Sequence, residues 1–115
     1  MTPDEFVASL SVAVVDENNA IYRSLLLNTR AEQAADPYWQ RVLKLFGELS
    51  ADQREVLLEL TRQVTIDAVA NVLGIIDGTC RLSGEGGRFR LICAGGDLGG
   101  DLQTLFLEHA EHASS

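Results

Sequence analysis

The chain has 115 residues, of which nine are Lys or Arg and seventeen are Asp or Glu, so the formal net charge is −8. This charge disfavours binding to nucleic acid or to an anionic membrane surface. The length and an apolar share of 46% are typical of one globular domain, which we expect to span residues 1–115.

The beginning of the sequence predicts a long helix rather than a secretion signal. Thr2 is a typical N-cap, and Pro3 followed by two acids is typical of a first helical turn. A secretion signal would carry positive charge there, and no apolar run approaches the length that spans a bilayer. We therefore expect a cytoplasmic protein that does not enter a membrane.

We expect this first helix to continue to about Leu27 or Asn28. At 3.6 residues per turn, a stripe about 100° wide collects Phe6, Val7, Leu10, Val14, Ile21 and Leu25. Two helices hinged at Asn18-Asn19 are the alternative, because asparagine readily leaves helical geometry.

A loop in the polar stretch 29–35 should lead into a short helix that begins at Asp36-Pro37 and ends near Leu49. This helix carries Trp39, the single tryptophan of the chain. Its position allows two interpretations, a binding anchor or a side chain that closes the helical bundle.

The stretch from Ser50 to Gly78 predicts the central helix. Ser50 and Gln53 form a capping box, and Gly78 favours a left-handed stop. A helical wheel predicts one broad apolar face made of Val56, Leu57, Leu60, Val64, Ala68, Val72 and Ile75. The opposite side carries Ile66, Val69, Leu73 and Ile76, with a weakly apolar wedge of Asp67, Ala70, Asn71 and Gly74.

Two alternating segments, 79–83 and 88–93, predict a β-hairpin. A tight turn at Gly86-Gly87 would place Cys80 opposite Cys93 and Leu82 opposite Leu91, on an apolar face that also carries Phe89 and packs on the helices. The other face would carry Arg81, Ser83, Arg88 and Arg90. The two cysteines are expected to be buried thiols, and a cross-strand disulfide is the alternative.

The glycine-rich stretch 94–101 is expected to connect the hairpin to a last helix, capped by Asp97 or Gly100. The apolar stripe of that helix consists of Leu98, Leu102, Leu105, Phe106 and Ala110. The stretch matches neither the dinucleotide fingerprint nor the P-loop. His109 and His112 are more typical of solvated residues near a helix C-terminus than of metal ligands. We therefore expect no metal and no cofactor.

Three parts of the sequence resemble uncharacterised small acidic bacterial proteins that combine helices with one hairpin. They are 39–43 (WQRVL), 73–78 (LGIIDG) and 102–107 (LQTLFL). Some small acidic bacterial domains of this kind are immunity proteins or other partner-binding modules. The resemblance implies no catalytic residue.

The sequence thus predicts a mainly helical α+β fold of about four helices with one antiparallel hairpin. We expect a non-enzymatic protein-binding module, of the immunity, antitoxin or regulatory kind, because catalytic residue sets are absent and the helices carry spare apolar stripes. A homodimer through the first helix is the corresponding assembly. The candidate partner- or anion-binding residues are Trp39, Asp67, Asn71, Arg81, Arg88 and Arg90. The alternative is a small ligand-binding protein or enzyme with a site near Asp67, Asn71 and the hairpin arginines.

Overall fold

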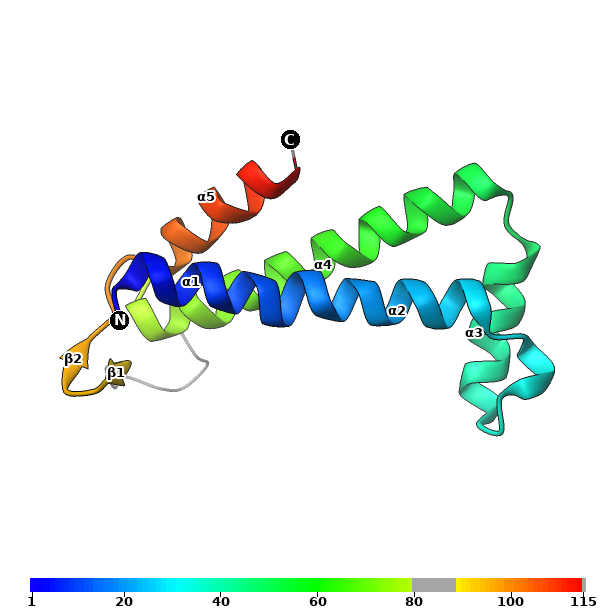
Figure 1. Ribbon diagram of the computed structural model, residues 1–115, viewed down its shortest axis with the longest axis horizontal. Helices are drawn as coiled ribbons and strands as arrows, with labels where there is room; N and C mark the ends of the chain where they lie inside the picture. Colours follow the sequence, from blue (N-terminus) through cyan, green and yellow to red (C-terminus); the bar gives the residue numbers. More distant parts are fainter. Residues whose placement is uncertain (80–88, 115) are drawn as a thin grey trace.

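The computed structural model describes residues 1–79 and 89–114. It confirms the predicted mainly helical α+β fold with one short antiparallel hairpin (Figure 1). In chain order the elements are α1 (Pro3–Ser11), η1 (Val12–Asp16), α2 (Glu17–Asn28), η2 (Ala31–Gln33), α3 (Pro37–Glu48), α4 (Ala51–Asp77), β1 (Ile92–Cys93), β2 (Gly96–Asp97) and α5 (Leu102–Ser114). Within the described residues, no helix combines the length and the apolar character needed to cross a membrane.

The first helix begins as predicted and is continuous through α1, η1 and α2. The Thr2 hydroxyl accepts a hydrogen bond from the Glu5 N–H, and the Glu5 carboxylate accepts one from the Thr2 N–H, both at 3.1 Å. Asn18 and Asn19 lie within regular α-helix. The single long helix is therefore confirmed, and the alternative with a hinge at Asn18-Asn19 is wrong.

Of the predicted apolar stripe, Val14 is partly buried against the core, but Ile21 is wrong, because η1 is a π-helix. A π turn closes its hydrogen bond one residue later than an α turn, so it holds an extra residue. The faces that follow are therefore displaced by about one position. Ile21 is 62% exposed, whereas Tyr22 and Leu26 line a pocket shared with α4.

Both ends of α4 lie where the sequence predicts them. Ser50 and Gln53 form the capping box, and Gly78 ends the helix in the left-handed conformation with φ +88°. The Thr79 N–H then donates to the Gly74 carbonyl at 2.9 Å. Thr79 therefore completes the helix cap and does not begin a strand.

The predicted choice of the apolar face of α4 is wrong. Four residues of the predicted face, Val56, Leu60, Val64 and Val72, are 56–63% exposed. The buried residues lie on the other side: Leu58, Ile66, Ala70, Leu73 and Gly74. Two of them, Ala70 and Gly74, belong to the predicted weakly apolar wedge. The reason is tertiary, because α1 and α5 pack on that other side of the C-terminal half.

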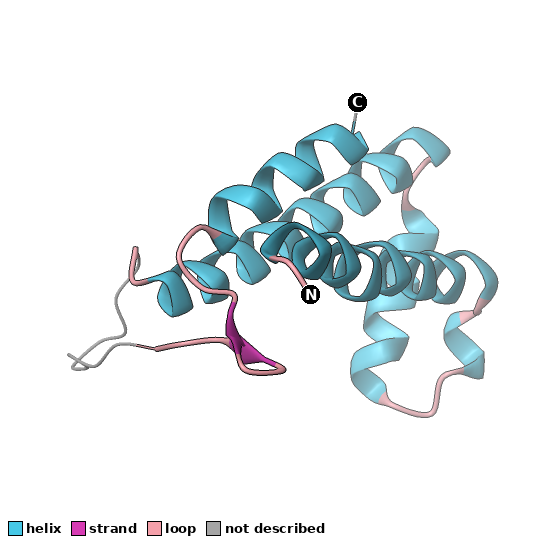
Figure 2. Cartoon of the chain, turned by 60° about the vertical axis from the view of Figure 1, so that its left-hand side comes forward, coloured by secondary structure: helices cyan, strands magenta, loops and turns pink. Residues whose placement is uncertain are grey.

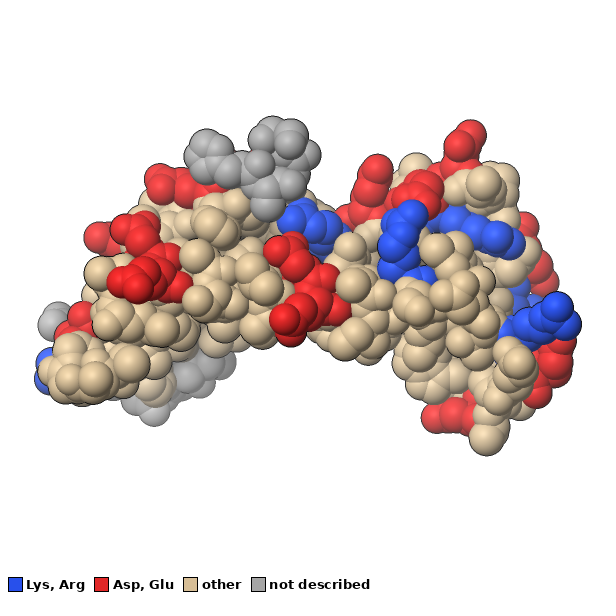
Figure 3. Space-filling view, in the orientation of Figure 1, with Lys and Arg blue, Asp and Glu red and all other residues tan. Residues whose placement is uncertain are grey.

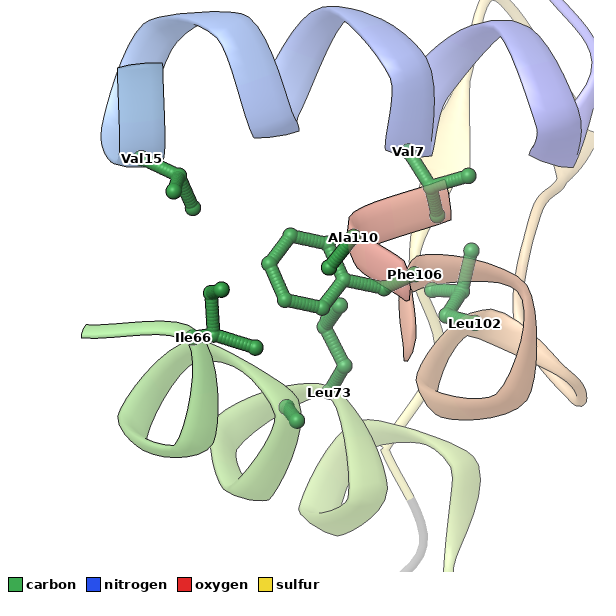
Figure 4. Close-up of a cluster of buried hydrophobic side chains, with 8 residues drawn as sticks. Val7, Val15, Ile66, Leu73, Leu102, Phe106 and Ala110 are labelled. Atoms are coloured by element: carbon green, nitrogen blue, oxygen red, sulfur yellow. The ribbon is translucent and has the colours of Figure 1, made fainter. Parts of the chain in front are cut away.

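The main core lies where α1, η1, the C-terminal half of α4 and α5 meet. Its buried members are Val7, Val15, Ile66, Ala70, Leu73, Leu102, Phe106 and Ala110. Figure 4 shows the Phe106 ring between Val7 of α1 and Leu73 of α4. Burying such a ring contributes about 2–3 kcal/mol to the stability of the fold. The packing of Phe106 therefore holds α5 against α1 and α4 at this end of the molecule.

Among the described residues, a hairpin forms later in the chain than the predicted one. Ile92 and Cys93 pair with Asp97 and Gly96, respectively, in the stretch that we expected to be a connection. The turn needs positive φ at both central positions, which Ala94 (φ 51°) and Gly95 (φ 84°) adopt. Cys93 is exposed, so its predicted burial is wrong. The predicted Gly86-Gly87 turn, and with it Cys80, Arg81, Leu82 and Arg88, lies outside the described residues.

The start of α5 is capped by a residue from α4. The Asp77 carboxylate accepts hydrogen bonds from the N–H groups of Gly100 at 3.0 Å and Gln103 at 2.8 Å. Asp97 instead accepts from the Gly99 N–H at 2.9 Å, within its own loop. The predicted cap by Asp97 or Gly100 is therefore wrong, because the cap comes from a residue distant in the sequence.

The molecule is elongated, with extents of 49 × 35 × 23 Å and a radius of gyration of 17.5 Å. A compact domain of similar length has a radius of gyration of about 13 Å. Figures 1 and 2 show that α5 lies beside α1 and the C-terminal half of α4, while α3 crosses the far ends of α2 and α4. One half of the molecule thus has three packed helices, and the other half is more open.

Candidate functional site: the α2–α4 face

The open half is built from α2 and the N-terminal half of α4, which run antiparallel and are joined by two ion pairs. Arg23 on α2 makes two hydrogen bonds to the Glu55 carboxylate, one of them at 3.1 Å. Asp16, just before α2, lies 3.8 Å from Arg62. The two ion pairs are seven residues apart along each helix, and the arginine comes from α2 in one pair and from α4 in the other. Together they fix which turns of α2 and α4 lie side by side.

The Arg23–Glu55 pair perturbs the titration of both groups. The hydrogen bond from the Arg23 guanidinium lowers the pKa of the Glu55 carboxyl, and the same bond raises the pKa of Arg23. Both side chains are exposed, so solvent screens the attraction. This pair therefore contributes more to the register of the helices than to stability.

A pocket of about 400 Å³ lies between these two helices. We define the α2–α4 face by the residues that line it: Asn18, Asn19, Tyr22, Leu26, Leu60, Thr61, Val64 and Thr65. Tyr22 is 45% exposed, and Leu60 and Val64 expose more than half of their surface. Within the described part of the chain, α2 has no buried residue at all. An apolar surface on a helix of this kind is typical of a binding face.

The α2–α4 face has polar groups that can form hydrogen bonds but few that titrate. Asn18 and Asn19 offer side-chain amides from α2. Thr61 and Thr65 of α4 donate their hydroxyl protons to the carbonyls of Leu58 and Thr61, at 2.9 and 3.0 Å, so their oxygens remain available as acceptors.

The lining of this pocket is apolar or uncharged. Its residue types are asparagine, tyrosine, leucine, threonine and valine, without a carboxylate, imidazole, thiol or amine among them. Of the groups that general acid–base catalysis uses, the lining holds the phenol of Tyr22. Among the described residues, no group of three or more His, Cys, Asp and Glu is arranged to hold a metal ion.

Trp39 lies next to this face through an aromatic cluster. Its ring centroid is 6.1 Å from that of Tyr22 on α2 and 5.5 Å from that of Tyr38, which it meets edge-on. Tyr38 is largely exposed, whereas Trp39 is half-buried. The Trp39 ring thus joins α3 to α2 and borders the exposed surface.

A second pocket of about 320 Å³ lies at the corner between α2 and α3, with Arg30, Lys44 and Arg54 in its lining. Arg54 already donates to the carbonyls of Phe46 and Gly47, both at 3.0 Å, at the end of α3. Figure 3 shows basic side chains gathered over this end of the molecule. Arg54 therefore has a structural role there as a C-terminal cap.

The other predicted site residues lie elsewhere. Asp67 and Asn71 are exposed on α4, and Asp67 accepts a hydrogen bond from Gln63 on the same helix at 2.9 Å. Arg90 pairs with Asp97 of the hairpin at 3.1 Å. The Gly99 N–H and, secondly, Arg90 lower the pKa of the Asp97 carboxyl. Asp67 and Arg90 thus each have a partner within their own segment, and Arg81 and Arg88 lie outside the described residues.

Four residues of the α2–α4 face, Tyr22, Leu26, Leu60 and Val64, are not among the site residues that the sequence predicts. Leu60 and Val64 follow Val56 at a spacing of four residues on the predicted broad apolar face of the central helix. Tyr22 and Leu26 lie outside the stripe predicted at 3.6 residues per turn, which does not allow for a π turn. The surplus of apolar residues over the needs of one small core was the available signal.

Comparisons with family models, curated proteins and solved structures found no match to this chain. The geometry of the site is therefore the basis for a functional proposal.

Proposed function

We propose that the chain is a non-enzymatic protein-binding module and that the α2–α4 face is its contact surface. The observation that carries this proposal is the exposed apolar pocket between α2 and α4, whose lining holds no carboxylate, imidazole, thiol or amine. Apolar anchors with a hydrogen-bonding surround are typical of protein interfaces.

The aromatic cluster adds a feature that favours a protein as the ligand. Tyrosine and tryptophan are enriched among the residues that dominate binding energy at interfaces. Tyr22 belongs to both the pocket and the cluster, and it links the two into one surface that includes Tyr38. The proposed role is that of an immunity, antitoxin or regulatory protein, acting in the bacterial cytoplasm.

Affinity capture with matched variants tests this function. The tagged chain, its Leu60→Glu variant and its Val72→Glu variant are each incubated with lysate of the source cell, and the bound proteins are quantified by mass spectrometry. Leu60 and Val72 lie on the same helix and are 57% and 56% exposed, but only Leu60 lines the pocket. A buried charge at an interface costs several kcal/mol, so we expect Leu60→Glu to reduce recovery of the partner at least tenfold.

The Val72→Glu variant should recover the partner as well as the unaltered chain does. Circular dichroism confirms that both variants remain helical before the comparison is made. Equal recovery of the partner by all three chains contradicts the proposed function. It is also contradicted if no protein is recovered in a constant ratio to the tagged chain.

A further inference from the structure

We draw no further inference here: the strongest candidate, the exposed apolar pocket between α2 and α4, belongs to the surface already described, and nothing in the structure shows what covers it.

Discussion

Single side chains fix the ends of helices in this protein, and Asp77 of α4 does so for the start of α5. It is the last residue of α4, and its carboxylate accepts hydrogen bonds from the backbone of Gly100 and Gln103 at the start of α5. N–H groups in the first turn of a helix have no partner within the helix, so they need such an acceptor. Asp77 therefore holds α5 in position against α4.

Replacement of Asp77 by alanine should lower the free energy of unfolding by about 1–2 kcal/mol, the usual cost of losing a helix cap. Urea denaturation followed by circular dichroism measures this change. Asp67→Ala is the control, because Asp67 is an exposed acid on the same helix whose hydrogen-bond partner, Gln63, is also on that helix. Its effect should stay within about 0.5 kcal/mol. Equal losses in both variants would show that Asp77 does not act as the cap.

Among the elements, the first helix illustrates how a local irregularity determines a distant surface. The π segment η1 lies between α1, which packs in the main core, and α2, which borders the exposed pocket. Beyond its extra residue, Tyr22 and Leu26 line the pocket shared with α4, and Ile21 is exposed. The composition of the α2–α4 face thus depends on the geometry of five residues, Val12–Asp16.

Deletion of Ala13, an exposed residue within η1, should convert the π turn to an α turn and leave both flanking faces in place. We expect the thermal midpoint to change by less than about 5 °C. The control is deletion of Ala68, an exposed alanine in the regular helix α4, which rotates Ala70 and Leu73 by about 100° away from the core. That deletion should abolish cooperative unfolding in a circular-dichroism melt. A larger loss on deletion of Ala13 than of Ala68 would contradict this account of η1.

At the scale of the whole molecule, the chain divides its apolar residues unequally between a closed half and an open half. Three helices enclose Phe106 and Leu102 in the closed half. Ion pairs and the aromatic cluster hold the open half together around an exposed pocket. This division explains the large radius of gyration and gives the molecule a surface available for a partner.

Acid should weaken the ion pair that joins α2 to α4. The pKa of Glu55 is lowered in the folded state, so its contribution to stability is present above the unfolded pKa of about 4.3 and is lost as the pH falls through the folded pKa. The Arg23→Gln variant lacks the guanidinium whose hydrogen bond lowers the pKa of Glu55. We expect the unaltered chain to have the higher urea midpoint at pH 7, and the difference to close as the pH falls from about 5 to 3.

The comparison with Arg23→Gln separates this effect from the change in net charge, which both chains share on acidification. The midpoints are measured at one protein concentration throughout. A difference that stays constant or widens toward pH 3 would show that the ion pair does not link pH to stability.

The sequence by itself determined the helix boundaries that depend on hydrogen bonds between near neighbours. The caps at Thr2, Asp36, Ser50 and Gly78 involve groups no more than a few residues apart, so their pattern is visible in the amino-acid order. The mainly helical α+β fold follows from the same local signals.

Only the tertiary structure decided which faces of those helices are buried. Both sides of α4 are apolar, so the sequence alone does not distinguish them. The packing of α1 and α5 buries Ile66 and Leu73 and leaves Leu60 and Val64 exposed. The cap of α5 by Asp77, like the pocket between α2 and α4, joins residues more than twenty positions apart. Such contacts depend on how whole elements pack, and that is why the candidate site was not visible in the order of residues.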